Sequence, residues 1–156
     1  MKIEVVAPLS GRVVSLEKVP DPVFSQRMLG DGLAIEPTEG RVVAPVSGRL
    51  SVFHSSKHAF VVQASETVGV LVHIGLDTVK LQGRSFFSEV QLGDQVQAGQ
   101  ELVRFDLQSV VDAGYSPLSP VILPDLPSHY RIEKTNREQV RAGVDILLVI
   151  LFDERE

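Results

Sequence analysis

Apolar and polar residues alternate in short runs along this chain, and turns rich in glycine and proline separate the runs. In one such run Val70, Val72 and Ile74 alternate with Leu71 and His73, which is the period of a β-strand with two different faces. No stretch keeps the apolar period of a helix for ten residues. The pattern therefore predicts an all-β protein in which His73 points away from the face of Val70 and Val72.

The same reading divides the rest of the chain into short elements. Strands are predicted at 33–37, 50–53, 59–64, 70–76 with a continuation through 79–81, 86–90, 102–106, 119–124 and 144–152. The strand at 119–124 is expected at a sheet edge, because its prolines cannot donate every ladder hydrogen bond. Short helical turns are predicted within 20–29 and 107–113, and 127–135 is predicted to be a loop.

The chain also repeats itself. The segment VVAPLSGRV at 5–13 returns as VVAPVSGRL at 42–50, with seven of nine positions identical, and 96–103 and 140–147 form a second, weaker pair. Each copy reads as a strand, a turn and a second strand. Together these observations predict an antiparallel β-sandwich or partly closed barrel, with an internally duplicated motif and one or two short helical turns.

Composition narrows the class of protein. A chain of 156 residues is expected to form a single domain over 1–156 with a substantial core. The net charge of -5, without a basic stripe, argues against a nucleic-acid partner. No apolar run approaches the roughly 18 residues of a transmembrane segment, and no signal peptide is recognised, so we expect a cytoplasmic protein. The absence of cysteine excludes disulfides, thiol catalysis and zinc-thiolate sites.

Two histidines are the candidate reactive groups. His73 shares its strand face with Leu71 and is followed by Gly75, which leaves room for a bulky group beside the ring, while His58 stands at the mouth of another apolar strand. An imidazole nitrogen can attack a phosphoryl group and hold it when a hydrogen bond fixes the other nitrogen. Ser56 could orient His58 through its hydroxyl. The two histidines could also hold zinc, completed by a partner's carboxylate or by water. On spacing alone, His73 could instead be a structural histidine on a sheet face.

Other chemistries lack the residues that they need. Gly-x-Ser-x-Gly, Walker-type, Gly-x-Gly-x-x-Gly and His-Glu-x-x-His motifs are absent. A lipoyl or biotinyl carrier domain would need a lysine at the repeated turn, where this chain has Ser-Gly-Arg. A metallopeptidase-like domain would need a His-x-His pair, which is also absent.

Several segments resemble the glucose-type EIIA domains of the bacterial phosphoenolpyruvate:sugar phosphotransferase system. The run HIGLDTVKLxG at 73–83 resembles the signature around the phosphorylated histidine of that family. The run SKHAF at 56–60 resembles the segment that carries the second active-site histidine. Further segments resemble the family at 3–11, 19–24, 29–37, 93–99 and 105–107, so the resemblance covers nearly the whole chain.

The resemblance implies an antiparallel β-sandwich that transfers a phosphoryl group without a required cofactor. His73 would accept the group from the phosphohistidine of HPr and pass it to a cysteine of an EIIB domain. His58 would bind the phosphoryl oxygens, and Ser56, where the family often has threonine, would hold His58. Asp21 and Asp77 would flank the site and meet a basic side chain of HPr.

The resemblance also implies an apolar docking surface, to which Phe24, Leu29, Gly30 and Leu71 would contribute. His54 falls where an aromatic docking residue is often seen, and we assign it no role. The alternative function is a regulatory or binding module of the same fold, which would signal its phosphorylation state to regulatory protein targets. The presence of both histidines favours transfer. The sequence does not identify the sugar, because EIIA domains do not touch it.

Overall fold

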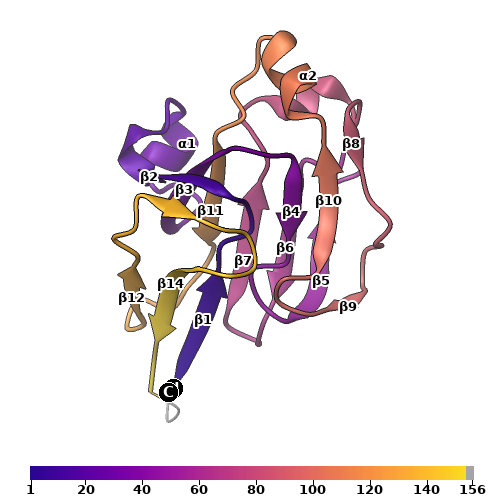
Figure 1. The fold of residues 1–156 in the computed structure, drawn as a ribbon. Coiled ribbons are helices and arrows are strands. Elements are labelled where there is room, and N and C mark those ends of the chain that lie inside the picture. The colour runs from indigo at the N-terminus through magenta and orange to yellow at the C-terminus, as the bar shows by residue number, and fades with distance from the viewer. Residues whose placement is uncertain (154–156) are drawn as a thin grey trace.

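The computed structural model describes residues 1–153, and most of its secondary structure is β (Figure 1). The strands in these residues are β1 (Lys2–Val6), β2 (Gly11–Ser15), β3 (Asp31–Pro37), β4 (Arg41–Val43), β5 (Gly48–Phe53), β6 (Ala59–Gln63), β7 (Gly69–His73), β8 (Phe86–Phe87), β9 (Gln95–Val96), β10 (Glu101–Phe105), β11 (Ser119–Leu123), β12 (Arg131–Lys134), β13 (Gln139–Val140) and β14 (Ile146–Leu151). The helices are α1 (Pro22–Ser25) and α2 (Leu107–Asp112), with the 3-10 turns η1 (Leu16–Lys18) and η2 (Thr78–Leu81). The predicted fold class, including the short helical turns, is confirmed.

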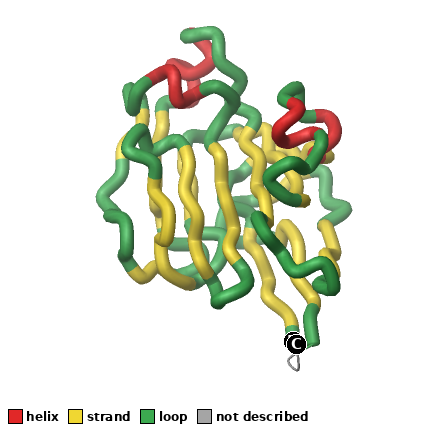
Figure 2. The backbone as a smooth tube through the Cα atoms, turned by 180° about the vertical axis from the view of Figure 1, so that it is seen from behind, coloured by secondary structure: helices red, strands yellow, loops and turns green. Residues whose placement is uncertain are grey.

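The strands form a layered antiparallel structure. The large sheet has the order β13-β2-β3-β11-β7-β6-β5-β9, and two smaller sheets have the orders β4-β10-β8 and β1-β14-β12. Figure 1 shows β4 and β10 in front of β5, β6 and β7, and Figure 2 shows the large sheet from behind, with both helices at the end opposite the C-terminus. The described strands form no closed barrel, because β13 and β9 are the unjoined ends of the large sheet. The main core lies between the layers.

The two copies of the repeated segment occupy equivalent places in the fold. Matched backbone hydrogen bonds join them reciprocally, from Val6 N–H to Pro45 O at 2.9 Å and from Val43 N–H to Pro8 O at 2.8 Å. The serines of the two turns are matched as well, since Ser10 Oγ accepts from Ala142 N–H and Ser47 Oγ accepts from Ala98 N–H, both at 2.9 Å. The repeat in the sequence is therefore a structural duplication.

The glycine that follows each of these serines brings two backbones too close together for a side chain. A Cβ atom would lie 2.0 Å from Glu36 O at Gly11, and 2.1 Å from Gln63 O at Gly48. We expect Gly48→Ala to lower the free energy of unfolding by about 3 kcal/mol, because the strands must separate to admit the methyl group. Urea denaturation followed by circular dichroism measures this loss.

Gly93→Ala is the matched control for this prediction. Gly93 lies in a turn at φ +95°, where an added Cβ would have no atom within 4 Å, whereas Gly48 is the first residue of β5. The Gly93→Ala variant should lose only the roughly 1 kcal/mol of stability that a left-handed backbone conformation costs an alanine. Equal losses in Gly48→Ala and Gly93→Ala would show that the close approach at Gly48 has no energetic consequence.

The sequence predicted a strand at the sheet edge over 119–124, and this prediction is wrong. β11 lies between β3 and β7, and all five of its residues are buried. Pro120 pairs with Ala34 of β3, but β7 pairs only with Val121 and Ile122. At Pro120 the strand therefore has a neighbour on one side only, and a missing N–H donor is tolerated there. The local sequence could not show which strand would be inserted beside it.

Three other boundaries also differ from the prediction. Residues 79–81 belong to η2 instead of continuing β7, because Gly75 and Asp77 adopt left-handed backbone conformations at φ +75° and +61° and turn the chain. β12 lies within the predicted loop 127–135, where mostly exposed residues pair with β14 and leave little apolar alternation to read. The predicted strand 86–90 is limited to Phe86 and Phe87.

Candidate functional site

The two faces of β7 are separated as the alternation predicted. Val70 and Val72 pack in the main core, whereas Leu71 packs against a smaller apolar cluster that contains Phe24 and Ile122. His73 is the last residue of β7 and is partly exposed, and its ring centroid lies 5.2 Å from that of Phe24 in α1. The histidine therefore lies at the end of a rigid central strand, beside the first helix.

One nitrogen of the His73 ring is fixed by a hydrogen bond. Nδ1 lies 2.7 Å from the carbonyl oxygen of Gly75, and a carbonyl can only accept, so Nδ1 carries the proton. In the neutral ring, Nε2 then keeps its lone pair. This is the tautomer that a nucleophilic histidine attacking through Nε2 requires.

The turn after β7 is held in place by the residues that lead into β11. Gly75 N–H donates to Ser119 Oγ at 3.1 Å, and Leu76 N–H donates to Ser116 O at 2.9 Å. The Gly75 carbonyl that holds His73 is thus anchored to a strand more than forty residues later in the chain. Residues 116 and 119 belong to the site indirectly, and sequence reasoning did not assign them to it.

The second histidine is buried next to the first. The ring centroids of His58 and His73 lie 5.1 Å apart at an interplanar angle of 80°, and only 4% of His58 is exposed. Pairing of Ala59 with His73 brings the start of β6 beside the end of β7, and Ile74 N–H donates to His58 O. Nδ1 of His58 is buried without a hydrogen-bond partner. Native proteins rarely leave a buried polar atom unpaired, because burial without a hydrogen bond carries a free-energy cost.

Ser56 was expected to orient His58 through its hydroxyl, but Nδ1 of His58 accepts no hydrogen bond from it. Instead, the backbone N–H of Ser56 donates to Nδ1 of His54 at 3.0 Å. Lys57, in the left-handed region at φ +62°, turns the chain between Ser56 and His58. The sequence spacing shows that these two residues are near one another, but the turn decides which groups meet.

His54, to which the sequence gave no role, also belongs to the site. It is exposed, as expected, but its ring centroid lies 4.4 Å from that of His58 at an interplanar angle of 64°. The three imidazoles of His54, His58 and His73 therefore lie in sequence, each next to the following one. The spacing of four residues between His54 and His58 could have suggested this, because a tight hairpin brings such positions together.

Burial and charge act in opposite directions on His73. Burial lowers its pKa, and this outweighs the hydrogen bond to Gly75 and the carboxylates of Asp21 and Asp77, which raise it, so the pKa lies below the ordinary 6.5. Asp21 is held by its own helix, since its side chain accepts from Val23 N–H at 3.0 Å and caps α1. Both predicted carboxylates are thus close enough to act on His73, which is neutral at pH 7.

Comparison with known proteins agrees with this geometry. The family model described as phosphoenolpyruvate-dependent sugar phosphotransferase system, EIIA 1, matches residues 3–127. The chain belongs to this family. Proteins of the EIIA 1 family are phosphotransferase components that carry the phosphoryl group on a histidine, so this EIIA chain is a phosphotransferase component, as the resemblance implied.

Individual relatives cover almost all of the chain. The "PTS system glucose-specific EIIA component" of Oceanobacillus iheyensis is 37% identical over 150 residues, which cover 96% of this chain and 91% of the relative. The protein of the same name from Staphylococcus epidermidis is 45% identical over 142 residues, covering 91% and 84%. The solved glucose permease IIA from Mycoplasma capricolum superposes with a TM-score of 0.90 at 40% identity and covers 96% of both chains. These matches support transfer and give no support to a purely regulatory module.

The low pKa of His58 in this EIIA chain predicts a specific loss of stability in acid. Burial, and then the neighbouring His73 and His54, lower its pKa from 6.5 to about 4. Below pH 6.5 the unfolded chain binds a proton that the folded chain does not bind until about pH 4, so stability falls as the pH falls through this window. From pH 7 to pH 5, this difference in proton binding at His58 should lower the free energy of unfolding by about 2 kcal/mol.

Urea denaturation at pH 7 and pH 5 measures this contribution. The wild-type protein should lose about 2 kcal/mol more than His58→Gln, because glutamine does not titrate. His129→Gln, which removes an exposed histidine outside the site, should behave like the wild type. An identical loss in His58→Gln would mean that another group causes the acid instability.

The predicted docking residues of this EIIA chain differ in their accessibility. Phe24 is only 4% exposed and packs against His73, so little of its side chain is accessible to a partner. Leu29 is 43% exposed, whereas Gly30 and Leu71 are partly buried. The sequence did not single out three other apolar side chains exposed on α1, the loop after it and η2, namely Val23 at 38%, Met28 at 67% and Val79 at 43%.

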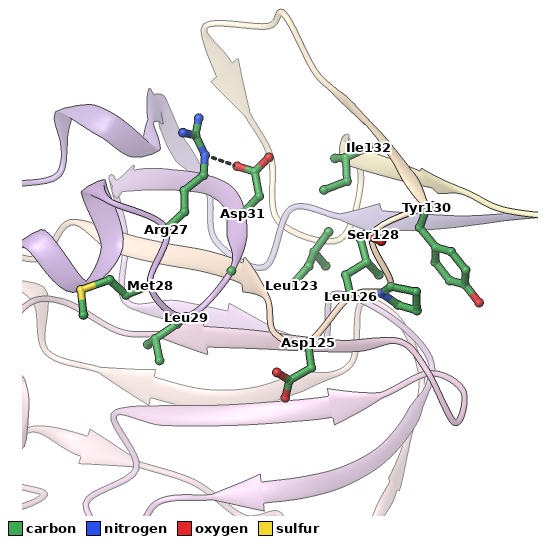
Figure 3. A pocket seen from close by; sticks show the side chains of 12 residues that line it. Arg27, Met28, Leu29, Asp31, Leu123, Asp125, Leu126, Ser128, Tyr130 and Ile132 are labelled. Atoms are coloured by element: carbon green, nitrogen blue, oxygen red, sulfur yellow. Dashed lines mark hydrogen bonds and ion pairs between the residues drawn. The ribbon is translucent and has the colours of Figure 1, made fainter.

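Leu29 and Gly30 also line a cleft of about 360 Å³, between the loop after α1 and the segment that joins β11 to β12 (Figure 3). An ion-pair network holds the loop there: Asp31 accepts from Arg27 at 2.9 Å and from Lys134 at 2.8 Å. Burial alone would raise the pKa of Asp31, but these bonds outweigh it and lower the pKa. The network fixes the position of Leu29 relative to β12.

Within residues 1–153, no group of three or more histidine, aspartate or glutamate side chains is arranged to hold a metal ion. In the same part of the chain, no helix has the length and apolar character needed to cross a membrane.

Proposed function

We propose that His73 accepts a phosphoryl group at Nε2 from the phosphohistidine of HPr and passes it to a cysteine of an EIIB domain. The hydrogen bond between Nδ1 of His73 and the Gly75 carbonyl carries this proposal, because it leaves Nε2 as the nucleophile. The lowered pKa of His73 keeps the ring neutral at pH 7, so the lone pair is available. The whole of 1–156 would act as one EIIA-like domain.

Each transfer exchanges one bond at phosphorus. In the first, the Nε2 lone pair of His73 attacks phosphorus, the N–P bond of the donor breaks, and its electron pair returns to the donor imidazole. In the second, a thiolate attacks the same phosphorus, and the electron pair of the His73 N–P bond returns to Nε2. The proton on Nδ1 stays in place throughout, where the Gly75 carbonyl stabilises the positive charge that develops on the ring.

His58 would stabilise the phosphoryl group on His73. The ring lies beside that of His73 and is neutral at pH 7, so it offers one N–H donor to a phosphoryl oxygen. The arriving negative charge would raise the pKa of His58 and favour a second proton, which strengthens the interaction.

The surface around the site suits brief encounters with two partners. We infer that Asp21 and Asp77, which already act electrostatically on His73, meet a basic side chain of HPr. The exposed Leu29, Met28 and Val23 would form the apolar part of the contact with HPr and EIIB. The names of the relatives support a permease of the glucose class as the acceptor, and the donor chemistry supports a cytoplasmic location.

Transfer between a histidine and a cysteine requires no metal or other cofactor, and we propose that none takes part. Zinc is a separate proposal for the same pair. His58 and His73 would supply two nitrogen ligands, and a partner's carboxylate or water would supply the remaining ones, since the described residues provide no third ligand.

Phosphoryl transfer from phosphoenolpyruvate tests the function directly. The protein is mixed with phosphoenolpyruvate, enzyme I and HPr, and its intact mass is followed. We expect the gain of one acid-labile phosphoryl group, which an added EIIB domain then removes. A wild-type chain that gains no phosphoryl group from a competent HPr would contradict the proposal.

A further inference from the structure

We propose that His54 is a positioning residue for this site, which sets the orientation of the His58 ring toward the phosphoryl group. The inference rests on the proposed role of His58 in stabilising that group. It adds a third histidine to the pair that the sequence indicated. His54 would act through His58, without touching the reacting atoms.

Three hydrogen bonds join His54 to the other residues of the hairpin that carries His58. The backbone N–H of His54 donates to Ala59 O at 2.9 Å, and its carbonyl accepts from Lys57 N–H at 2.8 Å. Its ring Nδ1 accepts from Ser56 N–H at 3.0 Å. A single residue therefore bonds to three positions of the turn between β5 and β6, and His58 lies inside that turn.

The ring of His58 depends on packing for its orientation. Its Nδ1 has no hydrogen-bond partner, so no bond at that atom fixes the ring plane. The ring packs instead against two other imidazoles, with centroid distances of 4.4 Å to His54 and 5.1 Å to His73. His73 is fixed by its own hydrogen bond to Gly75. His54 is therefore the neighbouring ring that can be replaced while that bond is kept.

The hydrogen bond to Ser56 also defines the tautomer of His54. Because Nδ1 accepts the Ser56 N–H, the ring carries its proton on Nε2. Two features of His54 can therefore be separated: the acceptor at the Nδ1 position and the aromatic ring. The proposal requires both, since the acceptor closes the turn and the ring packs on His58.

Three substitutions separate these features. His54→Asn places an amide oxygen near the position of Nδ1 and removes the ring, whereas His54→Phe keeps a ring and removes the acceptor. His54→Ala removes both. We expect His54→Ala to slow transfer from the phosphorylated protein to EIIB by about tenfold, as for a displaced electrostatic donor, and the other two variants to be intermediate. Ser55→Ala, an exposed neighbour in the same turn, should match the wild type.

A double-mutant cycle tests whether His54 acts through His58. Transfer to EIIB is compared in the wild type, His54→Ala, His58→Gln and the double variant. We expect no further loss when His54→Ala is added to His58→Gln, because the group that His54 positions is already absent. Losses that multiply in the double variant would overturn the proposal, and so would His54 variants that all transfer like the wild type.

Nuclear magnetic resonance of the unphosphorylated protein provides a test that is independent of transfer. The ring resonances of His58 should move in His54→Asn and in His54→Phe, while thermal unfolding stays close to that of the wild type. Unmoved His58 resonances would contradict the positioning role even in a chain that transfers normally. A wild-type chain that is never phosphorylated, but whose His58 resonances respond to His54, would contradict the proposed function alone.

Discussion

Replacing His73 with glutamine is expected to reduce phosphoryl acceptance at least a thousandfold. Glutamine places an amide nitrogen near the position of Nε2, but that nitrogen has no basic lone pair and cannot form the N–P bond. The substitution keeps a polar side chain of similar reach at the end of β7, so the fold should persist. Intact mass after incubation with phosphoenolpyruvate, enzyme I and HPr measures the loss.

Two further variants give this result its meaning. His58→Gln should still accept the phosphoryl group, because its role is to bind the phosphoryl oxygens, but it should pass the group on poorly. His129→Gln removes an exposed histidine whose ring meets that of Tyr130 edge to face, and it should be labelled like the wild type. Labelling of His73→Gln together with an unlabelled His58→Gln would reverse the roles of the two histidines.

Gly75→Ala is expected to have the second-largest effect, because it displaces the carbonyl that fixes His73. Gly75 adopts a left-handed conformation at φ +75°, and an added Cβ would lie 2.6 Å from Thr78 Cγ2 and 2.9 Å from Ser116 O. The turn must move, so Nδ1 of His73 loses its acceptor and the reactive tautomer is no longer selected. We expect phosphoryl acceptance to fall at least tenfold and the free energy of unfolding by about 3 kcal/mol.

Gly114→Ala separates the local collision from the cost of a left-handed alanine. Gly114 has a similar conformation at φ +90°, but a Cβ there would have no atom within 4 Å. This variant should lose about 1 kcal/mol of stability and keep full phosphoryl acceptance. The fraction of His73 with its proton on Nδ1, measured from ring nitrogen shifts, should fall only in Gly75→Ala. Full acceptance by Gly75→Ala would show that the tautomer does not depend on this turn.

Local periodicity carried most of the fold prediction. The alternation around His73 gave the correct division of β7 into a core face with Val70 and Val72 and an outer face with Leu71. The repeated turns also predicted the duplication, because the same backbone geometry requires the same proline, serine and glycine in both copies. These features depend on neighbours within a few residues, which a sequence displays directly.

The sequence did not predict which strands pair when they lie far apart along the chain. The position of β11 inside the large sheet depends on which strands pair with it, whereas the two prolines of the segment 119–124 indicated an edge. The edge strand β12 carries mainly exposed side chains, so no apolar pattern marked it. The burial of Phe24 beneath His73 likewise follows from the packing of α1 on the sheet, which the composition of that segment did not show.

By itself, the sequence determined the all-β class, the duplicated motif, the outward face of His73 and, through the resemblance of its motifs, the phosphotransferase family. The tertiary structure alone decided which groups hold the histidines of the site. Those choices depend on backbone turns and strand pairing: Gly75 turns its carbonyl toward His73, and the turn at Lys57 places the backbone N–H of Ser56 on Nδ1 of His54. A hydrogen bond requires a donor–acceptor distance within a few tenths of an ångström of its optimum and a nearly linear angle at the hydrogen. Residue spacing specifies proximity, and only the folded backbone specifies orientation.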